Sequence, residues 1–516
     1  MGAESYWLQT TKPLDYPVLS EDRRVDVAVV GGGMAGLCAA WEVARTGRTV
    51  AVLEAGRVGS ATSGHTTAKL SALHSLIYHD LRTSRGADTA ARYARAQSEA
   101  LEHIAEIIED LGLDCEFERR TAYTYTTDAS QVAHYRDEAV AASEAGLRAD
   151  FVTPEGLPFP TAGAVRLPEQ AQFHPTRFLQ GLAADIMARG GLIFENTRIV
   201  SADSGSPCRL RTADGSAVTA ESVLVTTGWP VFDRPELLAR LRPRRELVVA
   251  GPVDADRDPG GMFVTPENKT RSVRSAPLDE GRRLLIVTGE QHTPGAGGIE
   301  RRYRKLTEWA ARFGLTDVVY RWSAQDYSTS DKVPFIGRYP GRDHFWLATG
   351  FGGWGMTNSV AAARVLAAGV TETPAPDWAE AFTPHRFHPV HEARSIAGVL
   401  GSTARNFLSR PSGAPTAHDP ADVRPGQGAV LRLGGEECAV YRDEQGELHA
   451  VAARCSHLGC RVGFNEAERT WECPCHGSRF DVFGAVLQGP AVRPLQRKTV
   501  PGTAGTPGTG EAGDTE

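Results

Sequence analysis

Two short segments far along the chain bring together residues that commonly bind metals. CSHLGC starts at Cys455 and CPCHGS starts at Cys473, and a histidine, His457 or His476, follows each of these cysteines within three positions. Zinc fingers usually pair two cysteines in one segment with two histidines in another. One thiolate and one imidazole from each of two loops instead suits two irons, one bound by both cysteines and the other by both histidines. The spacing favours the two-iron site, and zinc is the alternative.

A second set of chemically informative residues lies near the start of the chain. Residues 25–30 are typical of a buried parallel strand, GGGMAG covers 31–36, a helical segment follows, and a second strand ends at Glu54. In such a unit Gly31 makes a tight turn, Gly33 lets a diphosphate approach a helix N-terminus, Gly36 permits close helix–strand packing, and the acid binds a ribose. The pattern predicts a dinucleotide site, and a glycine-rich turn without a ligand is the alternative.

The rest of the chain bears on which dinucleotide is bound. We find no second unit of this kind, and an enzyme that reduces a flavin with a nicotinamide usually needs one. The sequence therefore favours FAD, reduced directly by a substrate.

The chain resembles the D-amino-acid-oxidase-like FAD oxidoreductases in several segments, which follow in order from about Tyr6 to about Val370. These are the glycine-rich unit at 25–54, the loop GSATSGHTTAKLSALH, the segment EQAQFHPTRFLQGLA, the strand SVLVTTG and the stretch DKVPFIGRYPGRDHFWLATGFGGWGMTNSVAAARVLA. This superfamily includes glycine and sarcosine oxidases and dimethylglycine dehydrogenases. The resemblance implies these FAD-binding residues: Gly31, Gly33, Met34, Ala35, Gly36, Glu54, Ser63, His65, Thr66, Thr227, Gly228, Gly352, Gly353, Gly355, Met356 and Thr357.

The same resemblance suggests a substrate pocket without assigning a catalytic base. Comparable segments in the superfamily supply substrate contacts, which implies Arg274, Gln325, Tyr327 and Trp354 as pocket candidates. Some relatives attach FAD covalently through a loop histidine, but ATSGHTTAK lacks their Thr-Trp-His pattern. We therefore expect His65 to hydrogen-bond near the cofactor, and covalent attachment of FAD through His65 is the alternative.

Short strand patterns surround the cysteine and histidine segments, beginning near Asp419. They cover GAVLRL, ECAVYRD, LHAVAARC, TWECP and SRFDVFG and predict a small all-β module, which resembles a Rieske [2Fe–2S] domain. The resemblance implies that Cys455 and Cys473 bind one iron and His457 and His476 the other. It also implies a disulfide between Cys460 and Cys475, as in cytochrome-bc-type proteins, and a proline loop at 489–490 over the cluster.

Length and composition give the expected organisation. A chain of 516 residues suggests several domains, and a net charge of −7 gives no basic surface for nucleic acid. The start has no signal-peptide pattern, and the chain has no transmembrane segment by sequence, so we expect a cytoplasmic protein.

The fold class is α/β with an added all-β domain: a Rossmann-like FAD-binding domain, an interleaved mixed α+β substrate domain, and a Rieske domain. We assign 1–80, 160–235 and 325–375 to FAD binding, 81–159 and 236–324 to the substrate or cap domain, 376–418 to a linker, 419–500 to the Rieske domain and 501–516 to a disordered tail.

The two halves together suggest a dehydrogenase. A substrate, by resemblance an amine, an amino acid or an N-methylated amino acid, would reduce FAD, and single electrons would pass through the cluster to an external acceptor that is a protein or a quinone. One alternative is a redox carrier or sensor that turns over no small molecule. Another is the reverse direction, with the cluster donating electrons to FAD.

The residue at position 480 predicts the potential of the cluster. The bc-type pattern Gly-Ser-x-Tyr is here Gly477-Ser478-Arg479-Phe480, so one hydroxyl donor that would stabilise the reduced cluster is missing. We expect a midpoint potential below that of respiratory Rieske proteins, within the span of roughly −150 to +300 mV. A redox titration that gives a value near the top of this span would refute the expectation.

Overall fold

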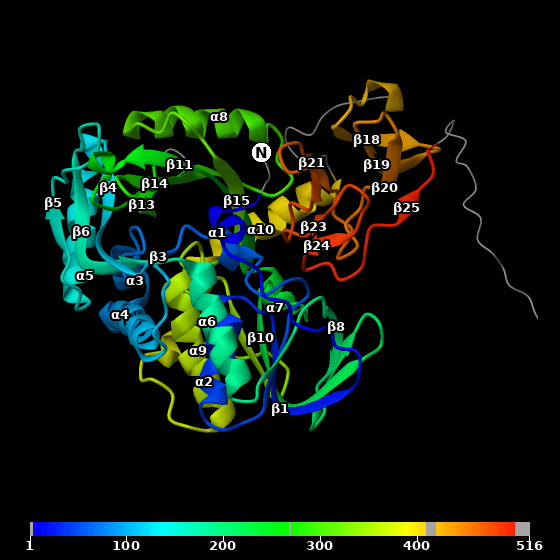
Figure 1. Ribbon diagram of the computed structural model, residues 1–516, viewed down its shortest axis with the longest axis horizontal. Helices are drawn as coiled ribbons and strands as arrows, with labels where there is room; N and C mark the ends of the chain where they lie inside the picture. The colour runs from blue at the N-terminus through cyan, green and yellow to red at the C-terminus, as the bar shows by residue number, and fades with distance from the viewer. Residues whose placement is uncertain (1–3, 233, 268–269, 409–418, 501–516) are drawn as a thin grey trace, which may run out of the picture.

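The structure is a computed structural model and describes residues 4–232, 234–267, 270–408 and 419–500. The chain folds into two large sheet layers with helices around them, and the cluster module lies beside both layers (Figure 1). The predicted tail at 501–516 lies outside the described residues. No helix in the described part of the chain is both long and apolar enough to span a bilayer.

The first layer is a mainly parallel sheet with the strand order β16-β17-β10-β1-β2-β7, and β9 and β8 extend it from β10. Its strands are β1 (Arg23–Val30), β2 (Val50–Leu53), β7 (Leu192–Phe194), β8 (Ile199–Asp203), β9 (Cys208–Thr212), β10 (Ala217–Gly228), β16 (Phe335–Arg338) and β17 (Phe345–Thr349). All four residues of β2 are buried, as expected for a strand covered on both faces. Helices α2 (Met34–Ala44), α6 (Pro175–Ala188) and α9 (Gly355–Thr371) pack together on this sheet (Figure 1).

The second layer is a mainly antiparallel sheet in the order β15-β11-β14-β13-β12-β4-β6-β3, with β5 beside β6. Its strands are β3 (Lys69–Leu70), β4 (Glu118–Thr126), β5 (Asp150–Val152), β6 (Gly163–Gln172), β11 (Leu241–Asp254), β12 (Gly261–Thr265), β13 (Arg271–Asp279), β14 (Arg282–His292) and β15 (Tyr320–Thr329). Helix α8 (Ile299–Ala310) packs on β11 and β14. Its other helices are α3 (Tyr78–Arg85), α4 (Ala87–Asp110) and α5 (Val132–Glu144), of which α5 packs on β5 and β6.

The boundary between these layers differs from the prediction at three strands. The predicted FAD-binding segments 1–80, 160–235 and 325–375 contain β3, β6 and the second half of β15, but all three strands hydrogen-bond in the second sheet. β6 pairs with β4 along most of its length, so backbone pairing with a distant strand decides its layer. The first sheet resumes only with α6 and β7.

The cluster module consists of two small antiparallel sheets, as the strand patterns predict. One contains β18 (Gly428–Leu433), β19 (Glu436–Arg442), β20 (Leu448–Ala452) and β25 (Arg497–Lys498), and the other β21 (Gly463–Asn465), β22 (Thr470–Glu472), β23 (Arg479–Phe480) and β24 (Val486–Gln488). The two cysteine–histidine segments form loops that flank β21 and β22. This arrangement brings two parts of the sequence 18 residues apart to one end of the module.

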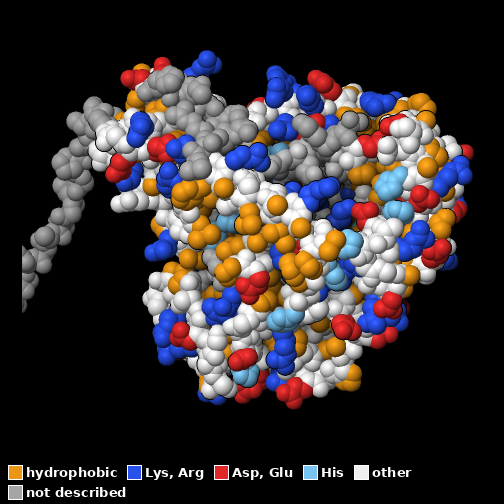
Figure 2. All heavy atoms as spheres, turned by 180° about the vertical axis from the view of Figure 1, so that it is seen from behind, with side chains coloured by type: hydrophobic (Ala, Val, Ile, Leu, Met, Phe, Trp, Pro, Cys, Tyr) orange, Lys and Arg blue, Asp and Glu red, His pale blue; other side chains and the backbone are white. Residues whose placement is uncertain are grey.

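The predicted linker contains a long helix that the proline-rich composition did not indicate. Helix α10 (Pro389–Leu408) lies within 376–418, and Glu392 anchors it through a buried ion pair with Arg240 (Nε to Oε2, 2.8 Å). Its outer side stays apolar, because Val390 is 86% exposed and Leu400 is 55% exposed. Figure 2 shows hydrophobic side chains gathered near the middle of the face opposite to that of Figure 1. The segment thus contains a folded element, which contacts Arg240 near one end and Arg454 and Arg461 of the cluster module near the other.

Candidate active site

The glycine turn after β1 is built for close approach of a ligand. Gly31 has φ +110°, and a Cβ there would lie 3.0 Å from the carbonyl oxygen of Thr226. The Thr226 hydroxyl donates to the carbonyls of Val30 (3.0 Å) and Gly31 (3.1 Å), which fixes the turn. At Gly36 a Cβ would lie 1.9 Å from the Gly31 oxygen, so this glycine serves helix–strand packing and does not line the cavity beside the turn.

The N-termini of two helices border the same cavity. α2 begins after Gly33 and α9 after Trp354, and among the described residues no capping side chain of either N-cap satisfies their first backbone N–H groups. The Met34 N–H instead donates to Ser63 Oγ (2.9 Å). Neither first turn contains an acidic residue. Unsatisfied N–H groups and the helix dipole give both ends a partial positive charge, which suits a diphosphate at one end and an electron-rich ring at the other.

Glu54 occupies the position expected for a ribose-binding acid. It lies at the end of β2, where Oε2 accepts a hydrogen bond from the Gly32 N–H (2.7 Å) and Oε1 from the Gly56 N–H (2.8 Å). Burial raises the pKa of the Glu54 carboxyl above its usual range, although these two backbone bonds oppose the shift. Each carboxylate oxygen has a second lone pair that can accept from a hydroxyl group.

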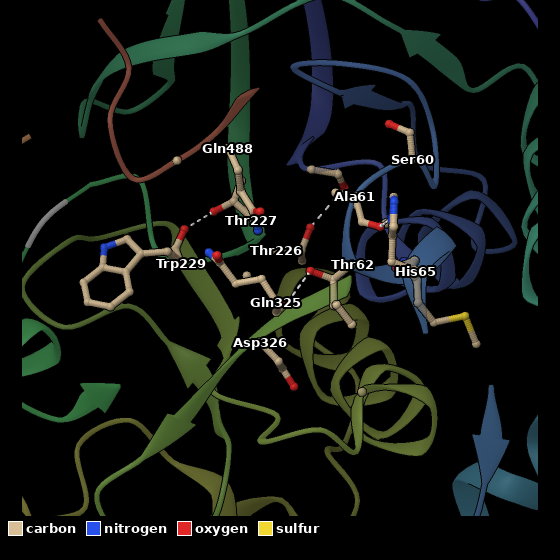
Figure 3. Close-up of a pocket in the computed structure, with 18 of the residues that line it drawn as sticks. Ser60, Ala61, Thr62, His65, Thr226, Thr227, Trp229, Gln325, Asp326 and Gln488 are labelled. Carbon is tan, nitrogen blue, oxygen red and sulfur yellow. Dashed lines mark hydrogen bonds between the residues drawn. The ribbon is translucent and has the colours of Figure 1, made fainter. Parts of the chain in front are cut away.

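A cavity of about 460 Å³ connects these features (Figure 3). Its volume and its cradle of glycines, hydroxyls and helix ends fit a nucleotide cofactor. The predicted cofactor residues that line it are Gly31, Gly33, Met34, Ala35, Glu54, Ser63, His65, Thr66, Thr227, Gly228, Gly353, Gly355 and Met356.

The loop histidine of the cavity is held by its own helical turn. His65 Nδ1 lies 2.9 Å from the Ala61 carbonyl oxygen, and the two residues face the cavity together in Figure 3. Desolvation lowers the pKa of His65, which favours the neutral imidazole.

Two of the remaining predicted cofactor residues lie behind the lining. The Thr357 hydroxyl lies 3.2 Å from His74 Nε2 and donates to the Ser71 carbonyl (3.3 Å), so it joins α9 to the loop after β3. The Gly352 N–H donates to the Tyr327 carbonyl (2.9 Å) and shapes the turn that precedes α9. Both residues therefore support the cavity from outside.

Only one of the four predicted substrate-pocket residues, Gln325, lines this cavity. Tyr327 is 2% exposed and accepts a hydrogen bond from Gln325 Nε2 (2.9 Å), whereas Trp354 stacks on His74 with ring centroids 4.5 Å apart. Arg274 is 1% exposed, and its Nε and Nη2 atoms have no hydrogen-bond partner among the described residues. These three side chains lie behind the wall, so they are not brought to the cavity as the sequence suggests.

Part of the cavity wall comes from the cluster module. Six of its residues contribute: Arg479, Leu487, Gln488, Gly489, Ala491 and Val492. Figure 3 shows Gln488 among the residues that line the cavity, together with Thr227 and Gln325. The predicted proline loop at 489–490 is therefore shared, since the Ala491 N–H also donates to Ser478 Oγ (3.0 Å) beside the cluster ligands. No local sequence signal links this loop with the glycine turn of β1.

The four predicted iron ligands converge at the end of the module. Cys455 and Cys473 are 3% and 1% exposed, and the imidazole rings of His457 and His476 have centroids 5.0 Å apart. A hydrogen bond from the Cys473 thiol lowers the pKa of Cys455, so of the two thiols Cys455 is the one that loses its proton more readily. Two thiols and two imidazoles on two adjacent loops fit a Rieske [2Fe–2S] centre.

Other groups fix the two cluster loops to each other. Cys460 and Cys475 form the expected disulfide, with Cα atoms 6.5 Å apart. Ser478 hydrogen-bonds the Cys455 thiol, and Phe480 is fully buried in the same apolar core as the ligand cysteines. The serine thus supplies one donor to the cluster sulfurs, while Phe480 supplies packing and no hydroxyl.

A buried ion network joins the cluster module to the second sheet. The guanidinium of Arg245 on β11 is 1% exposed and lies 2.7 Å from a carboxylate oxygen of Glu468; it also pairs with Glu472, directly before the ligand Cys473. Burial raises the pKa of Glu468, but the charges of Arg245 and Arg479 outweigh it and hold the pKa at about 2. The Glu472 carboxylate also accepts from the Gly295 N–H (2.9 Å). The Glu468 carboxylate is therefore charged at neutral pH, and both carboxylates have partners across the interface.

Comparison with known families divides the chain into two parts, which correspond to the two large sheets and to the cluster module. Residues 26–368 match the family model described as "FAD dependent oxidoreductase", and residues 415–500 match "Rieske [2Fe-2S] domain". One relative shares both parts: "Putative Rieske 2Fe-2S iron-sulfur protein YhfW" of Bacillus subtilis (strain 168), 33% identical over 96% of this chain and 97% of its own.

Two further relatives match the larger part alone. "Gamma-glutamylputrescine oxidoreductase" of Escherichia coli (strain K12) is 26% identical over 70% of this chain and 87% of its own. The crystal structure of glycine oxidase from Geobacillus kaustophilus superposes with a TM-score of 0.58 at 22% identity, over 71% of this chain and all of that one, and so shows the fold.

The Arg245 network predicts a large effect of removing one charge. Arg245→Met removes the buried positive charge that pairs with Glu468 and Glu472. Breaking a buried ion pair in this way lowers the free energy of unfolding by about 3 kcal/mol or more. We expect the free energy of unfolding to fall by this amount in urea titrations followed by the visible absorbance of the cluster.

Arg282→Met is the matched control, because the Arg282 side chain is 52% exposed and pairs with Asp279 at the surface. Its loss should change the free energy of unfolding much less, because water and salt screen an exposed pair. Equal destabilisation by the two variants would contradict the role of the Arg245 network.

Proposed function

Because the chain belongs to the FAD dependent oxidoreductase family and ends in a Rieske [2Fe–2S] domain, we propose that it is a dehydrogenase of C–N bonds. In this proposal an amine, an amino acid or an N-methylated amino acid reduces FAD, and the cluster passes the electrons singly to an external acceptor. FAD and the [2Fe–2S] cluster are its cofactors. The bound FAD supplies a two-electron acceptor, and the cluster a one-electron carrier.

One observation carries this proposal: the wall shared by the cofactor cavity and the cluster domain. Gly489 and Ala491 line the cavity, and Ala491 also hydrogen-bonds Ser478 beside the cluster ligands. A cluster at this position can receive electrons from the cofactor without any movement of the domain. An oxidase that reduces oxygen at its flavin would have no use for such a carrier.

The residues of the cavity have defined tasks in this proposal. The turn at Gly31 and the N-terminus of α2 bind the diphosphate, and Glu54 binds the ribose. The backbone N–H groups at the start of α9, beside Gly353 and Gly355, stabilise negative charge on the reduced ring. A neutral amine that is well aligned with the ring needs no dedicated base, and we assign none.

Two lines of support favour a substrate that contains an amine and a carboxylate. Glycine oxidase and gamma-glutamylputrescine oxidoreductase, to which this chain is similar, are named for such donors. Arg274 and Lys69 also place positive charge directly behind the cavity: Lys69 Nζ donates to Thr67 Oγ1 (2.7 Å), and Thr67 lines the cavity. Desolvation, with the charge of Arg274, lowers the pKa of Lys69 to about 7. A substrate carboxylate would gain two donors by drawing Arg274 forward.

The external acceptor is a protein or a quinone in this proposal, and the protein acts in the cytoplasm. No nucleic acid partner is proposed for a chain with a net charge of −7.

Anaerobic bleaching of the flavin tests the enzyme proposal. We expect at least one member of a panel of amines, amino acids and N-methylated amino acids to bleach the flavin absorbance of the holoprotein without oxygen. The competing function is that of a redox carrier or sensor. If no panel member bleaches the flavin, while a ferredoxin or a quinone analogue exchanges electrons with the cluster, the competing function is correct.

Arg274→Met tests the carboxylate contact. A charge-assisted hydrogen bond contributes about 1.5–3 kcal/mol, so KM for a substrate with a carboxylate should rise roughly tenfold to a hundredfold. FAD content and KM for the matching amine without a carboxylate should not change. An equal rise in KM for both substrates would contradict the contact.

A further inference from the structure

The two iron-binding histidines face different surroundings. His476 is 4% exposed, and its ring centroid lies 5.0 Å from the indole of Trp229, which follows β10 in the FAD-binding domain. His457 is only partly buried, and its neighbour Leu458 is 49% exposed. One edge of the cluster site is therefore covered by the FAD-binding domain, and the other lies near the surface.

Trp229 connects the covered edge with the cofactor cavity. Trp229 is 2% exposed and is one of the residues that line the cavity, and Figure 3 shows it at one end of the pocket. The Thr227 hydroxyl donates to the Trp229 carbonyl (2.6 Å), and Tyr327 packs edge-on against the ring, with centroids 5.3 Å apart. Trp229 therefore belongs to the cavity wall, and its indole contacts both Tyr327 and His476.

A hydrogen bond makes a second connection at the same place. Gln325 lines the cavity, and its Nε2 donates to the carbonyl of Gly477 (2.7 Å), the residue directly after His476. Gly477 has φ +80°, and a Cβ there would lie 2.6 Å from Gln325 Nε2 and 3.0 Å from Pro243 Cβ. Any other residue at position 477 would strain the backbone and displace the Gln325 amide, so glycine permits this close contact.

The contact is maintained by the folded arrangement of the domains. The Arg245 network lies on the neighbouring strand, where Arg245 pairs in register with Gln325. Rigid positioning matters here, because the protein contributes to redox chemistry by holding the centres close together and correctly oriented.

We propose that electrons cross between FAD and the cluster through the His476 edge, by way of the Trp229 ring contact and the Gln325–Gly477 hydrogen bond. This inference rests on the function proposed above. Oxidation of one C–N bond releases two electrons and two protons, and the protons leave to solvent. Each crossing reduces one ferric iron of the cluster to ferrous iron. The external acceptor must reoxidise the cluster before the second electron crosses, so one turnover needs two successive one-electron transfers, to two one-electron carriers or to one quinone.

The test measures this crossing directly in the full-length holoprotein. The flavin is photoreduced without oxygen by a light pulse with 5-deazaflavin and a tertiary amine, and cluster reduction is followed by absorbance and by freeze-quench EPR. Trp229→Leu and Gln325→Leu should each slow cluster reduction by roughly tenfold or more, because a small loss of alignment has large effects on rate. FAD content, iron content and the midpoint potential of the cluster should stay at wild-type values.

Two variants separate this role from a general effect on folding. Trp229→Phe keeps an aromatic ring and should retain most of the wild-type rate. Trp309→Leu removes a tryptophan from α8 that packs on Phe313 and should leave the rate unchanged.

The result also separates this proposal from the function on which it rests. Fast cluster reduction in the wild type and equally fast reduction in Trp229→Leu and Gln325→Leu would overturn the route alone. A wild-type cluster that takes no electron from the reduced flavin would overturn both the route and the FAD-to-cluster circuit.

Discussion

The guanidinium of Arg245 lies in the protein interior between two carboxylates of another domain, and the shape of the active site depends on this interaction. Transferring such ionisable groups from water to the protein interior costs desolvation free energy. This cost is offset only when the guanidinium and the carboxylates form hydrogen bonds with good geometry. Such a network adds little stability compared with an apolar contact, but it penalises every orientation in which the charges do not meet. It therefore selects one docked position of the cluster domain. In that position the proline loop closes the cofactor cavity.

The sequence predicts the parts of the site that local chemistry determines. Gly31 and Gly33 fit a tight turn and the close approach of a ligand, and the spacing of Cys455, His457, Cys473 and His476 is the one expected of two loops that would hold two irons. Each of these signals lies within a few residues. The predicted fold class also holds, because periodic strand and helix patterns are local as well.

Features that depend on distant contacts could not be predicted in the same way. β6 carries an ordinary strand pattern, and only its pairing with β4 places it in the second sheet. Thr357 lies next to cavity residues in sequence, yet its hydroxyl bonds to the loop at Ser71. The wall from Leu487 to Val492 has no motif that refers to the first domain, and Trp229 resembles any core tryptophan until His476 is placed beside it.

The shared wall also has a consequence for how the holoprotein is made. The chain is synthesised from the N-terminus, and earlier domains generally fold first. All other parts of the cavity wall are complete before residues 487–492 emerge. The cradle is therefore open on that side while the cluster domain is still being made, and it is narrowed when that domain docks. FAD therefore has its widest access to the cavity before the cluster domain is complete and docked. This order of assembly follows from the shared wall and from neither domain alone.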